Sequence, residues 1–401
     1  MNARLLYLCG TGTWFLAFGI QTVTFAWLVT MVLEESPEMV GVAQMTMLIP
    51  TMLLILVGGS LADQLGGRRM VMIAQSAAVL PPILLLAAIW ADALTFKVMI
   101  GYAVVMGVAQ AFVTPARDGL LAHVAEGRIQ RTVVLVNMTQ FSIQMAGFGI
   151  ASFAETLGPR PILAIQSAIL GIGVIAFSRI TAPAPSFMER RMLRDMLASI
   201  HEGYRSVIAS RPMRMVSLHN CAMGIFFMGS YVVTLPLLVR EVYDGSSADL
   251  SWMNGCNALG LVTTILMLMR FGDIRRMGRA LLLSQVVGSL ALASVGFFHL
   301  GFSWLLVLVY LWGMCGGVTM SMSRAIMQEQ APENQRGRVM AFFSFSFMGA
   351  GPVGALANGF LVDWVGPETA LVIAGSMMLV TILVITATSQ LWRFEGHVHS
   401  A

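Results

Sequence analysis

The sequence predicts an all-α membrane protein with twelve transmembrane helices in two pseudo-symmetric six-helix bundles. Hydrophobic residues make up 57% of the 401 positions and charged residues only 11%, whereas soluble domains carry about 25% charged residues. Long apolar runs alternate with short charged links, and the charged links of the second half repeat those of the first. A soluble globular class is therefore excluded.

The apolar runs are each long enough to cross a bilayer, which needs roughly 20 mostly apolar residues. In chain order they cover residues 5–33, 39–62, 69–91, 96–117, 130–154, 160–179, 213–239, 250–270, 277–299, 302–325, 338–361 and 368–391. We expect residues 1–180 to form the N-terminal bundle, 181–212 a cytoplasmic linker and 213–401 the C-terminal bundle.

The linker carries apolar side chains at helical spacing, with Met192, Met196, Ile200 and Tyr204 four residues apart. This pattern predicts an amphipathic helix that lies on the membrane surface. A plain connection and a regulatory element are both compatible with it.

Equivalent residues recur in the two halves at a nearly constant offset. Arg117 and Arg324 are 207 residues apart, and the Asp63 to Arg69 segment is repeated 210 residues later between Asp273 and Arg279. A repeat of this kind indicates two related bundles with the substrate site between them near the middle of the membrane.

The basic residues predict the orientation. With the N-terminus inside, every basic residue except Lys97, Arg160 and Arg240 lies on the inner side, while the acidic residues divide evenly. Basic loops are retained in the cytoplasm. We therefore expect both termini and the linker to be cytoplasmic.

Several kinds of chemistry are excluded. The single lysine, Lys97, does not follow a glycine, so a phosphate-binding Gly-Lys loop is absent. The four cysteines form no Cys-x-x-Cys pair, which argues against zinc sites and a disulfide framework. The spans contain no cluster of His, Asp or Cys. We expect no enzyme activity, cofactor, metal or nucleic-acid partner.

The link between the second and third spans has the composition of a tight cytoplasmic turn. Gly59 permits close helix approach, Gly66 permits a sharp reversal, and Arg68 and Arg69 stand at the membrane edge. Asp63 can accept a bond from an arginine or from helix N–H groups. Such a contact breaks when helices separate, so this link is a candidate gate.

This link resembles the loop 2–3 signature of the major facilitator superfamily, through Gly59, Leu61, Ala62, Asp63, Gly66, Arg68 and Arg69. Three further stretches, at residues 115–121, 235–238 and 331–340, resemble motifs of its third drug:proton antiporter group, which includes enterobactin exporters and macrolide efflux pumps. One departure is that residues 147–150 lack the proline that exporters usually carry there, although Gly351-Pro352-Val353-Gly354 keeps it.

The resemblance implies that the helices around a central cavity hold the substrate. Uncharged polar and aromatic residues on those helices or on the flanking ones are the candidate substrate-binding residues: Gln21, Trp27, Gln110, Asn137, Gln140, Gln144, Asn220, Phe226, Tyr231, Asn254 and Asn257. Each amide has the alternative role of joining two helices by hydrogen bonds.

Titratable residues inside or at the ends of spans are the candidates for proton coupling. They are His219, Asp63, Asp118, Glu155 and Asp363. The candidate gating residues are Gly59, Asp63, Gly66, Arg68, Arg69, Asp273, Arg279, Arg117 and Arg324. A histidine within a span can exchange protons near neutral pH, but it can also bond a neighbouring carbonyl.

The functional prediction is a secondary active transporter of the bacterial inner membrane. It would export a small apolar or amphipathic compound of the drug or siderophore type by proton antiport, as residues 1–180 rock against 213–401. The alternative is a uniporter or importer of a neutral metabolite, or a lipid translocator. We expect a monomer in the lipid bilayer, with a small-molecule substrate and protons as its partners.

Overall fold

The computed structural model describes residues 3–124, 129–180, 193–271, 274–298, 301–332 and 335–394. Within these ranges the regular structure is entirely helical. Eleven of the described helices are long and apolar enough to cross a membrane. The helix Ile129–Ala151 adds a further 23-residue segment after the fourth of them. These observations confirm the predicted all-α membrane fold.

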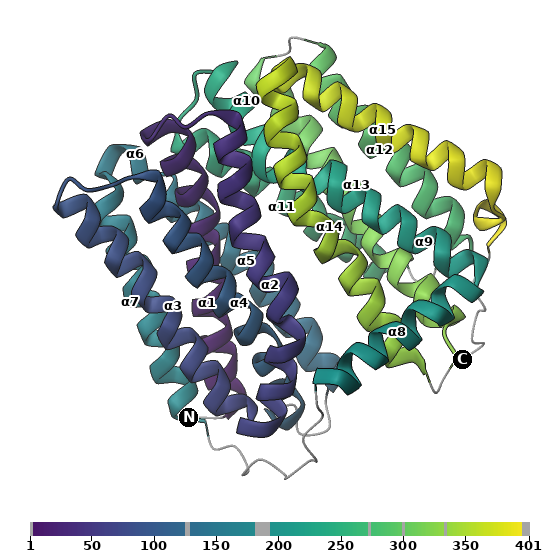
Figure 1. Cartoon of the computed structure of the whole chain (residues 1–401), viewed down its shortest axis with the longest axis horizontal. Coiled ribbons are helices and arrows are strands. Elements are labelled where there is room, and N and C mark those ends of the chain that lie inside the picture. Colours follow the sequence, from purple (N-terminus) through teal and green to yellow (C-terminus); the bar gives the residue numbers. More distant parts are fainter. Residues whose placement is uncertain are drawn as a thin grey trace. The chain divides into compact units, whose positions relative to one another are not determined.

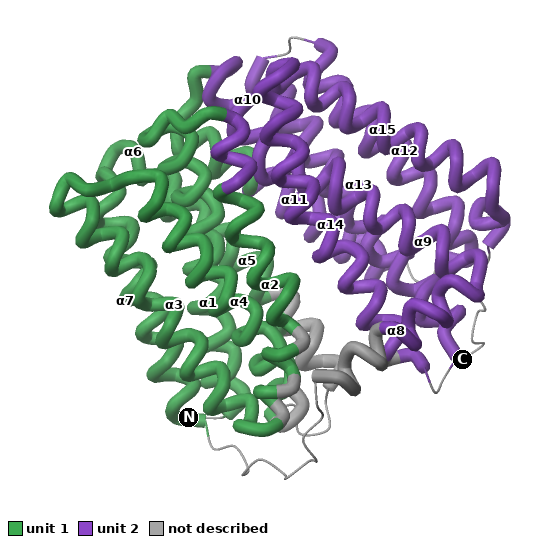
Figure 2. The backbone as a smooth tube through the Cα atoms, viewed as in Figure 1, with its two compact units in different colours: residues 1–36, 43–193, 244–254 green, residues 37–42, 194–243, 255–401 purple. Residues whose placement is uncertain are grey.

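The chain divides into two compact units, shown in green and purple in Figure 2. Unit 1 contains Met1–Ser36, Ala43–Leu193 and Asp244–Asn254. Its helices are α1 (Ala3–Trp27), η1 (Leu28–Val32), most of α2 (Pro37–Leu65), α3 (Gly67–Trp90), α4 (Phe96–Val124), α5 (Ile129–Ala151), α6 (Ala154–Leu157) and α7 (Pro159–Ser178). Inside the unit, α1 packs against α5 and α7, and α3 packs against α4 and α7 (Figure 1).

Unit 2 contains Pro37–Val42, Arg194–Tyr243 and Gly255–Ala401. Its helices are α8 (Leu193–Ala209), α9 (Arg211–Ala222), η2 (Met223–Met228), η3 (Ser230–Thr234), α10 (Leu235–Glu241), most of α11 (Ser247–Phe271), α12 (Met277–Phe297), α13 (Phe302–Gln330), α14 (Arg336–Val365), α15 (Pro367–Thr388) and η5 (Leu391–Arg393). The helices from α9 to α10 form one span, Arg211–Glu241. Here α12 packs against α13 and α15, and α14 packs against α9 and η2.

Repeated start signals explain why helices begin at equivalent places in the two halves. Gly158 and Gly366 both have a φ of 80°, and each is followed by the proline that opens α7 or α15. A glycine adopts this left-handed backbone without strain, and a proline suits the first position of a helix. The predicted spans agree closely with these helices, although α4 continues to Val124 and α13 to Gln330.

The linker helix α8 forms as its apolar pattern predicts, but the described part of its apolar face is partly covered by protein. Val207 is buried, and the Tyr204 ring lies 5.7 Å from the ring of Phe342 in α14. Arg338 of α14 forms an ion pair with Glu202. These contacts cover part of the apolar face, and the prediction that the helix lies on the membrane surface stays a prediction.

Candidate functional site

A buried arginine lies near the C-terminal end of α4. Because α4 extends seven residues beyond Arg117, this side chain is only 6% exposed instead of standing at the predicted helix end. Its guanidinium carbon lies 4.4 Å from the centre of the Phe15 ring, and its Nε lies 3.9 Å from Asp118 Oδ1. The Tyr7 hydroxyl donates to the Arg117 carbonyl oxygen at 3.1 Å. Residues of α1 thus hold this cation inside unit 1.

The guanidinium of Arg117 keeps unused hydrogen-bonding capacity. Its Nε and Nη1 atoms are buried and have no hydrogen-bond partner among the described residues. A buried cation next to an aromatic face is stabilised by the ring quadrupole. The candidate gating residue Arg117 is thus fixed in place within unit 1 through Phe15, Tyr7 and Asp118.

His219 is completely buried in α9. Neither of its ring nitrogens has a hydrogen-bond partner in the described part of the chain. The next residue, Asn220, donates to the Phe343 carbonyl oxygen at 3.0 Å and to Ser346 Oγ at 3.1 Å, both in α14. Asn220 therefore joins two helices, whereas His219 is a buried titratable group that no described contact accounts for.

The span that contains His219 widens into two π-helical segments, η2 and η3. An aromatic cluster forms beside them: the Trp312 ring of α13 lies 5.3 Å from the Phe227 ring and 6.0 Å from the Tyr231 ring. The predicted residue Tyr231 belongs to this cluster, while the predicted Phe226 is only half-buried and its neighbour Phe227 makes the contact. Single π-helical turns often accompany functional sites.

Asn358 of α14 is the polar centre of this region. Its Oδ1 accepts hydrogen bonds from Ser230 and Thr234, at 3.3 and 3.1 Å. Its Nδ2 donates to the carbonyl oxygens of Gly354 and Ile225, at 2.9 and 3.1 Å. Gly354, the last residue of the Gly-Pro-Val-Gly motif, packs so closely on the backbone of Gly224 and Ile225 that a larger residue would clash. The motif therefore brings α14 against η2.

Other predicted amides make contacts within their own unit or their own helix. Gln21 donates to the Met47 sulfur at 3.2 Å, and its Oε1 is buried with no described partner. Asn254 donates to the Leu250 carbonyl oxygen at 2.7 Å within α11. Asn257 donates to the Val309 carbonyl oxygen of α13 at 3.4 Å. Gln21 and Asn257 thus contact a neighbouring helix, and Asn254 bonds its own helix.

Glu155 lies near the start of α11 within unit 1. The backbone N–H of Ser247 donates to Glu155 Oε2 at 3.3 Å, and the N–H of Glu155 donates to Ser247 Oγ at 3.1 Å. Ser247 Oγ in turn donates to the Ser152 carbonyl oxygen at 3.1 Å. A carboxylate is favourable at a helix N-terminus because unpaired N–H groups point toward it. The predicted proton-coupling residue Glu155 therefore caps a helix start here.

The candidate gating residues divide by the contacts they make. Arg68 donates to the Ser178 carbonyl oxygen at the end of α7, and Arg279 donates to the Trp392 carbonyl oxygen just beyond α15, at 3.3 Å. Gly66 has a φ of 82° between α2 and α3. Arg69, Arg324 and Asp363 are exposed. A Cβ atom added to Gly59 would lie 3.9 Å from the Cβ of Pro115, which is ordinary van der Waals contact.

The remaining candidate residues are characterised by their burial alone. Trp27 is buried, whereas Gln110, Gln140 and Gln144 are half-buried. The side chains of Asp63 and Asn137 and the whole of Asp273 lie outside the described residues. Within the described part, no group of three or more His, Cys, Asp or Glu residues could hold a metal ion.

Buried glutamines form a second polar feature, at equivalent places in the two halves. Gln75 of α3 donates to the Leu170 carbonyl oxygen at 3.1 Å, and Gln285 of α12 accepts from Thr319 at 3.3 Å. Both are fully buried and 210 residues apart. The constant offset between the two halves of the sequence was the signal that could have identified Gln75 as the equivalent of Gln285.

Comparison with known proteins supports a transport function for this arrangement. The chain is 26% identical over 387 residues to the multidrug efflux pump Tap of Mycolicibacterium fortuitum, covering 92% of this chain and 91% of the relative. It is 23% identical over 338 residues to the staphyloferrin A transporter of Staphylococcus aureus, covering 81% of each chain.

Solved structures share the fold at low sequence identity. The nucleoside transporter NupG aligns with a TM-score of 0.77 at 13% identity, over 96% of this chain and 99% of that one. The human organic anion transporter MFSD10 aligns with a TM-score of 0.67 at 14% identity, over 96% and 99%. The family model of the Major Facilitator Superfamily matches residues 8–355 and 221–394. The chain is therefore a multi-pass integral membrane transporter that belongs to the major facilitator superfamily.

Proposed function

We propose that this transporter exports small apolar or amphipathic compounds of the drug or siderophore type from the bacterial cytoplasm, across the plasma membrane. The single observation that carries this proposal is its similarity to a multidrug efflux pump along nine-tenths of both chains. The similarity to a siderophore transporter supports the same class of substrate.

The chemistry of the polar and aromatic residues is consistent with such a substrate. The cluster of Phe227, Tyr231 and Trp312 provides aromatic surface, and the nearby polar groups are amides and hydroxyls. Among the described Asp, Glu, Lys and Arg side chains, Arg117 alone is buried. Sites that bind small molecules are mostly apolar with a few polar groups, as this composition would provide.

His219 is the best candidate for coupling export to protons. Polar groups inside a membrane are costly unless they are paired, so a buried histidine with no hydrogen-bond partner among the described residues calls for a functional reason. An imidazole exchanges protons in the physiological range. Glu155, Asp63, Asp118 and Asp363 remain the candidates at the ends of the spans.

The test is efflux of an amphipathic dye such as ethidium from energised membrane vesicles. Coupled export predicts that a protonophore abolishes uphill transport and that His219→Gln lowers it at least tenfold. His201→Gln is the matched control, because His201 is exposed in α8. Uphill transport that continues undiminished after the proton gradient has collapsed would contradict coupling.

The alternative is a uniporter or importer of a neutral substrate, or a lipid translocator. The scarcity of buried charge in the described spans favours it, because a uniporter needs no titratable group. In that case the dye would equilibrate across the membrane whatever the gradient, and His219→Gln would change only the apparent affinity.

The proposed orientation places both termini and the linker in the cytoplasm. In a variant without the native cysteines, Ala93→Cys in the exposed link between α3 and α4 should react with an impermeant maleimide added to intact cells. Ser186→Cys in the linker should react only after the membrane is permeabilised. The reverse pattern would show that the orientation is inverted.

A further inference from the structure

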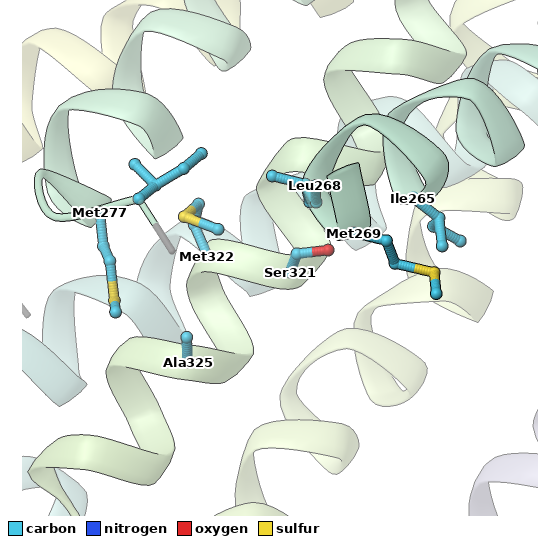
Figure 3. Close-up of a pocket in the computed structure, with 8 residues that line it drawn as sticks. Ile265, Leu268, Met269, Met277, Ser321, Met322 and Ala325 are labelled. Carbon is cyan, nitrogen blue, oxygen red and sulfur yellow. The ribbon is translucent and has the colours of Figure 1, made fainter. Parts of the chain in front are cut away.

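An apolar groove of about 330 Å³ lies inside unit 2, where α11 ends and α12 begins. Residues of α11, of α13 and of the start of α12 line it (Figure 3). The lining residues are Ile265, Leu268, Met269, Ile274, Met277, Ser321, Met322 and Ala325. Ser321 is the one hydroxyl among them, and its Oγ already donates to the Gly317 carbonyl oxygen of its own helix at 2.9 Å. The groove therefore presents a mostly apolar surface.

Exposed arginines are adjacent in the sequence to these lining residues. Arg270 follows Met269, Arg275 follows Ile274, and Arg324 precedes Ala325. Arg276 adds a fourth exposed basic residue next to Met277. The sequence between Arg270 and Arg276 contains one acidic residue, Asp273, which lies outside the described residues. The chain segments next to the groove therefore contain more arginines than acidic residues.

We propose that this groove binds an anionic phospholipid, with one acyl chain against the methionines and its phosphate against Arg270 and Arg275. Basic pockets between membrane helices on the cytoplasmic side bind acidic lipid headgroups, because a guanidinium pairs with phosphate oxygens. Flexible thioethers such as those of Met269, Met277 and Met322 adapt to an irregular hydrocarbon chain.

The location favours a membrane lipid over a transported compound. The groove lies at the ends of the spans Ser247–Arg270 and Met277–Phe297, where a lipid headgroup meets the hydrocarbon region. Its volume accommodates part of an acyl chain and is at the lower limit for a drug-sized ligand. Met269 is 59% exposed, so one wall remains accessible to a chain that enters from the side.

The headgroup contact can be tested by native mass spectrometry of the full chain in detergent, titrated with dioleoyl-phosphatidylglycerol or dioleoyl-phosphatidylcholine. We expect one phosphatidylglycerol to be retained per chain and phosphatidylcholine to be lost. The double variant Arg270→Gln, Arg275→Gln should weaken retention about thirtyfold, because each arginine near an anionic lipid contributes about fivefold. Arg69→Gln is the matched control, since it removes an exposed arginine from the equivalent turn of the first half.

The acyl contact needs a second variant that leaves the charges unchanged. Ala325→Phe should fill the groove and weaken retention of phosphatidylglycerol, while Ser321→Leu provides a milder filling if the first variant unfolds. Dihexanoyl-phosphatidylglycerol, whose chains are too short to fill the groove, should bind more weakly than the dioleoyl lipid. Equal retention of the two dioleoyl lipids, or full retention by the double arginine variant, would overturn the proposal.

Discussion

The two equivalent turns of the repeat, α2–α3 and α11–α12, carry similar charges but are packed differently. In the first half a single residue, Gly66, separates the two helices, and Gly67 packs against α4 with its ideal Cβ only 2.7 Å from the Ala116 carbonyl oxygen. In the second half α11 is described as far as Phe271 and α12 begins at Met277, which stands at the position equivalent to Gly67. Met277 lines the apolar groove instead of closing onto α13.

The comparison shows that the repeated charges do not determine how tightly each turn packs. We infer that the side-chain volume at the position of Gly67 and Met277 limits how closely the start of the helix approaches its neighbour. In each half one arginine donates to a backbone carbonyl oxygen at or just beyond the end of the last helix, Arg68 in the first half and Arg279 in the second. Arg279 is equivalent to Arg69, so the position of this arginine differs by one residue between the halves. Gly278 explains this shift, because its backbone lies so close to the Leu391 carbonyl oxygen that no side chain fits there.

The largest expected effect comes from exchanging the residues at this position. Gly67→Met introduces a side chain where even a Cβ would lie 2.7 Å from the Ala116 oxygen and 3.2 Å from the Leu120 nitrogen. Both neighbours are backbone atoms that cannot rotate away, so we expect a loss of about 3 kcal/mol or more. Thermal unfolding in detergent should show a large fall in midpoint or a loss of folded protein.

The reciprocal change is the control. Met277→Gly removes a side chain that lines an open groove, so it should cost less than about 1 kcal/mol. If Gly67→Met has no greater effect than Met277→Gly, the proposed difference in packing between the turns is wrong.

A second difference between the halves concerns the polar contacts of α14. Gly354 in the second half corresponds to Ile150 in the first. Four residues after Gly354 stands Asn358, which makes four hydrogen bonds, whereas four residues after Ile150 stands Ala154, which has no polar side chain. Hydrogen bonds between membrane helices are worth about 0.6 kcal/mol each. Asn358→Leu should therefore lower stability by about 2 kcal/mol in chemical unfolding.

Asn257→Leu tests whether this effect is specific to Asn358. Asn257 makes a single described bond of 3.4 Å, so its replacement should cost about 0.5 kcal/mol or less. Equal losses for the two variants would show that Asn358 is not a special anchor of α14.

Much of this architecture could be predicted from the sequence. The apolar runs located the spans within a few residues, because the bilayer imposes a length that composition reveals directly. The glycine and proline pairs at 158–159 and 366–367 marked helix starts because their backbone preferences are local. The resemblance of the turn motif to the superfamily predicted the correct family.

Individual side-chain partners could not be predicted in this way. Phe226 was a candidate from the sequence, and in the structure its neighbour Phe227 packs against Trp312, within a span whose π-helical turns shift the helical register. The sequence assigned Arg117 to a helix end, because the continuation of α4 to Val124 carries polar residues. It missed Asn358 and Gln75, whose importance comes from close contacts with other helices. Such contacts depend on how helices pack, and apolar periodicity does not reveal them.

The third prediction concerns transport. We propose that Asp63 controls the balance between the two conformational states of the transporter, and that the close packing of Gly67 on α4 makes this residue more important than Asp273. Asp63→Asn should lower efflux about tenfold with normal expression and substrate binding, because a charge contact of 1–3 kcal/mol shifts a two-state population. Asp273→Asn should lower it less in the same vesicle assay. A larger effect of Asp273→Asn would reverse the assignment of the main gate.

The smallest expected effect distinguishes the two arginines that bond the ends of the last helices. Arg279 combines its bond to the Trp392 carbonyl oxygen with a position 5.7 Å from the Trp392 ring centre, whereas Arg68 donates to the Ser178 carbonyl oxygen. A double-mutant cycle of Arg279→Gln with Trp392→Leu should show a coupling of about 0.5–1 kcal/mol in the free energy of unfolding.

The equivalent cycle of Arg68→Gln with Ser178→Ala should show no coupling, because the Ser178 hydroxyl donates to its own helix at Ile175 and takes no part in the contact. This difference follows from the register shift at Gly278: the second half places its cation one residue later, where it meets an aromatic ring. If the two cycles give equal coupling free energies, the two arginines stabilise their halves in the same way, and the groove is the remaining difference between the two turns.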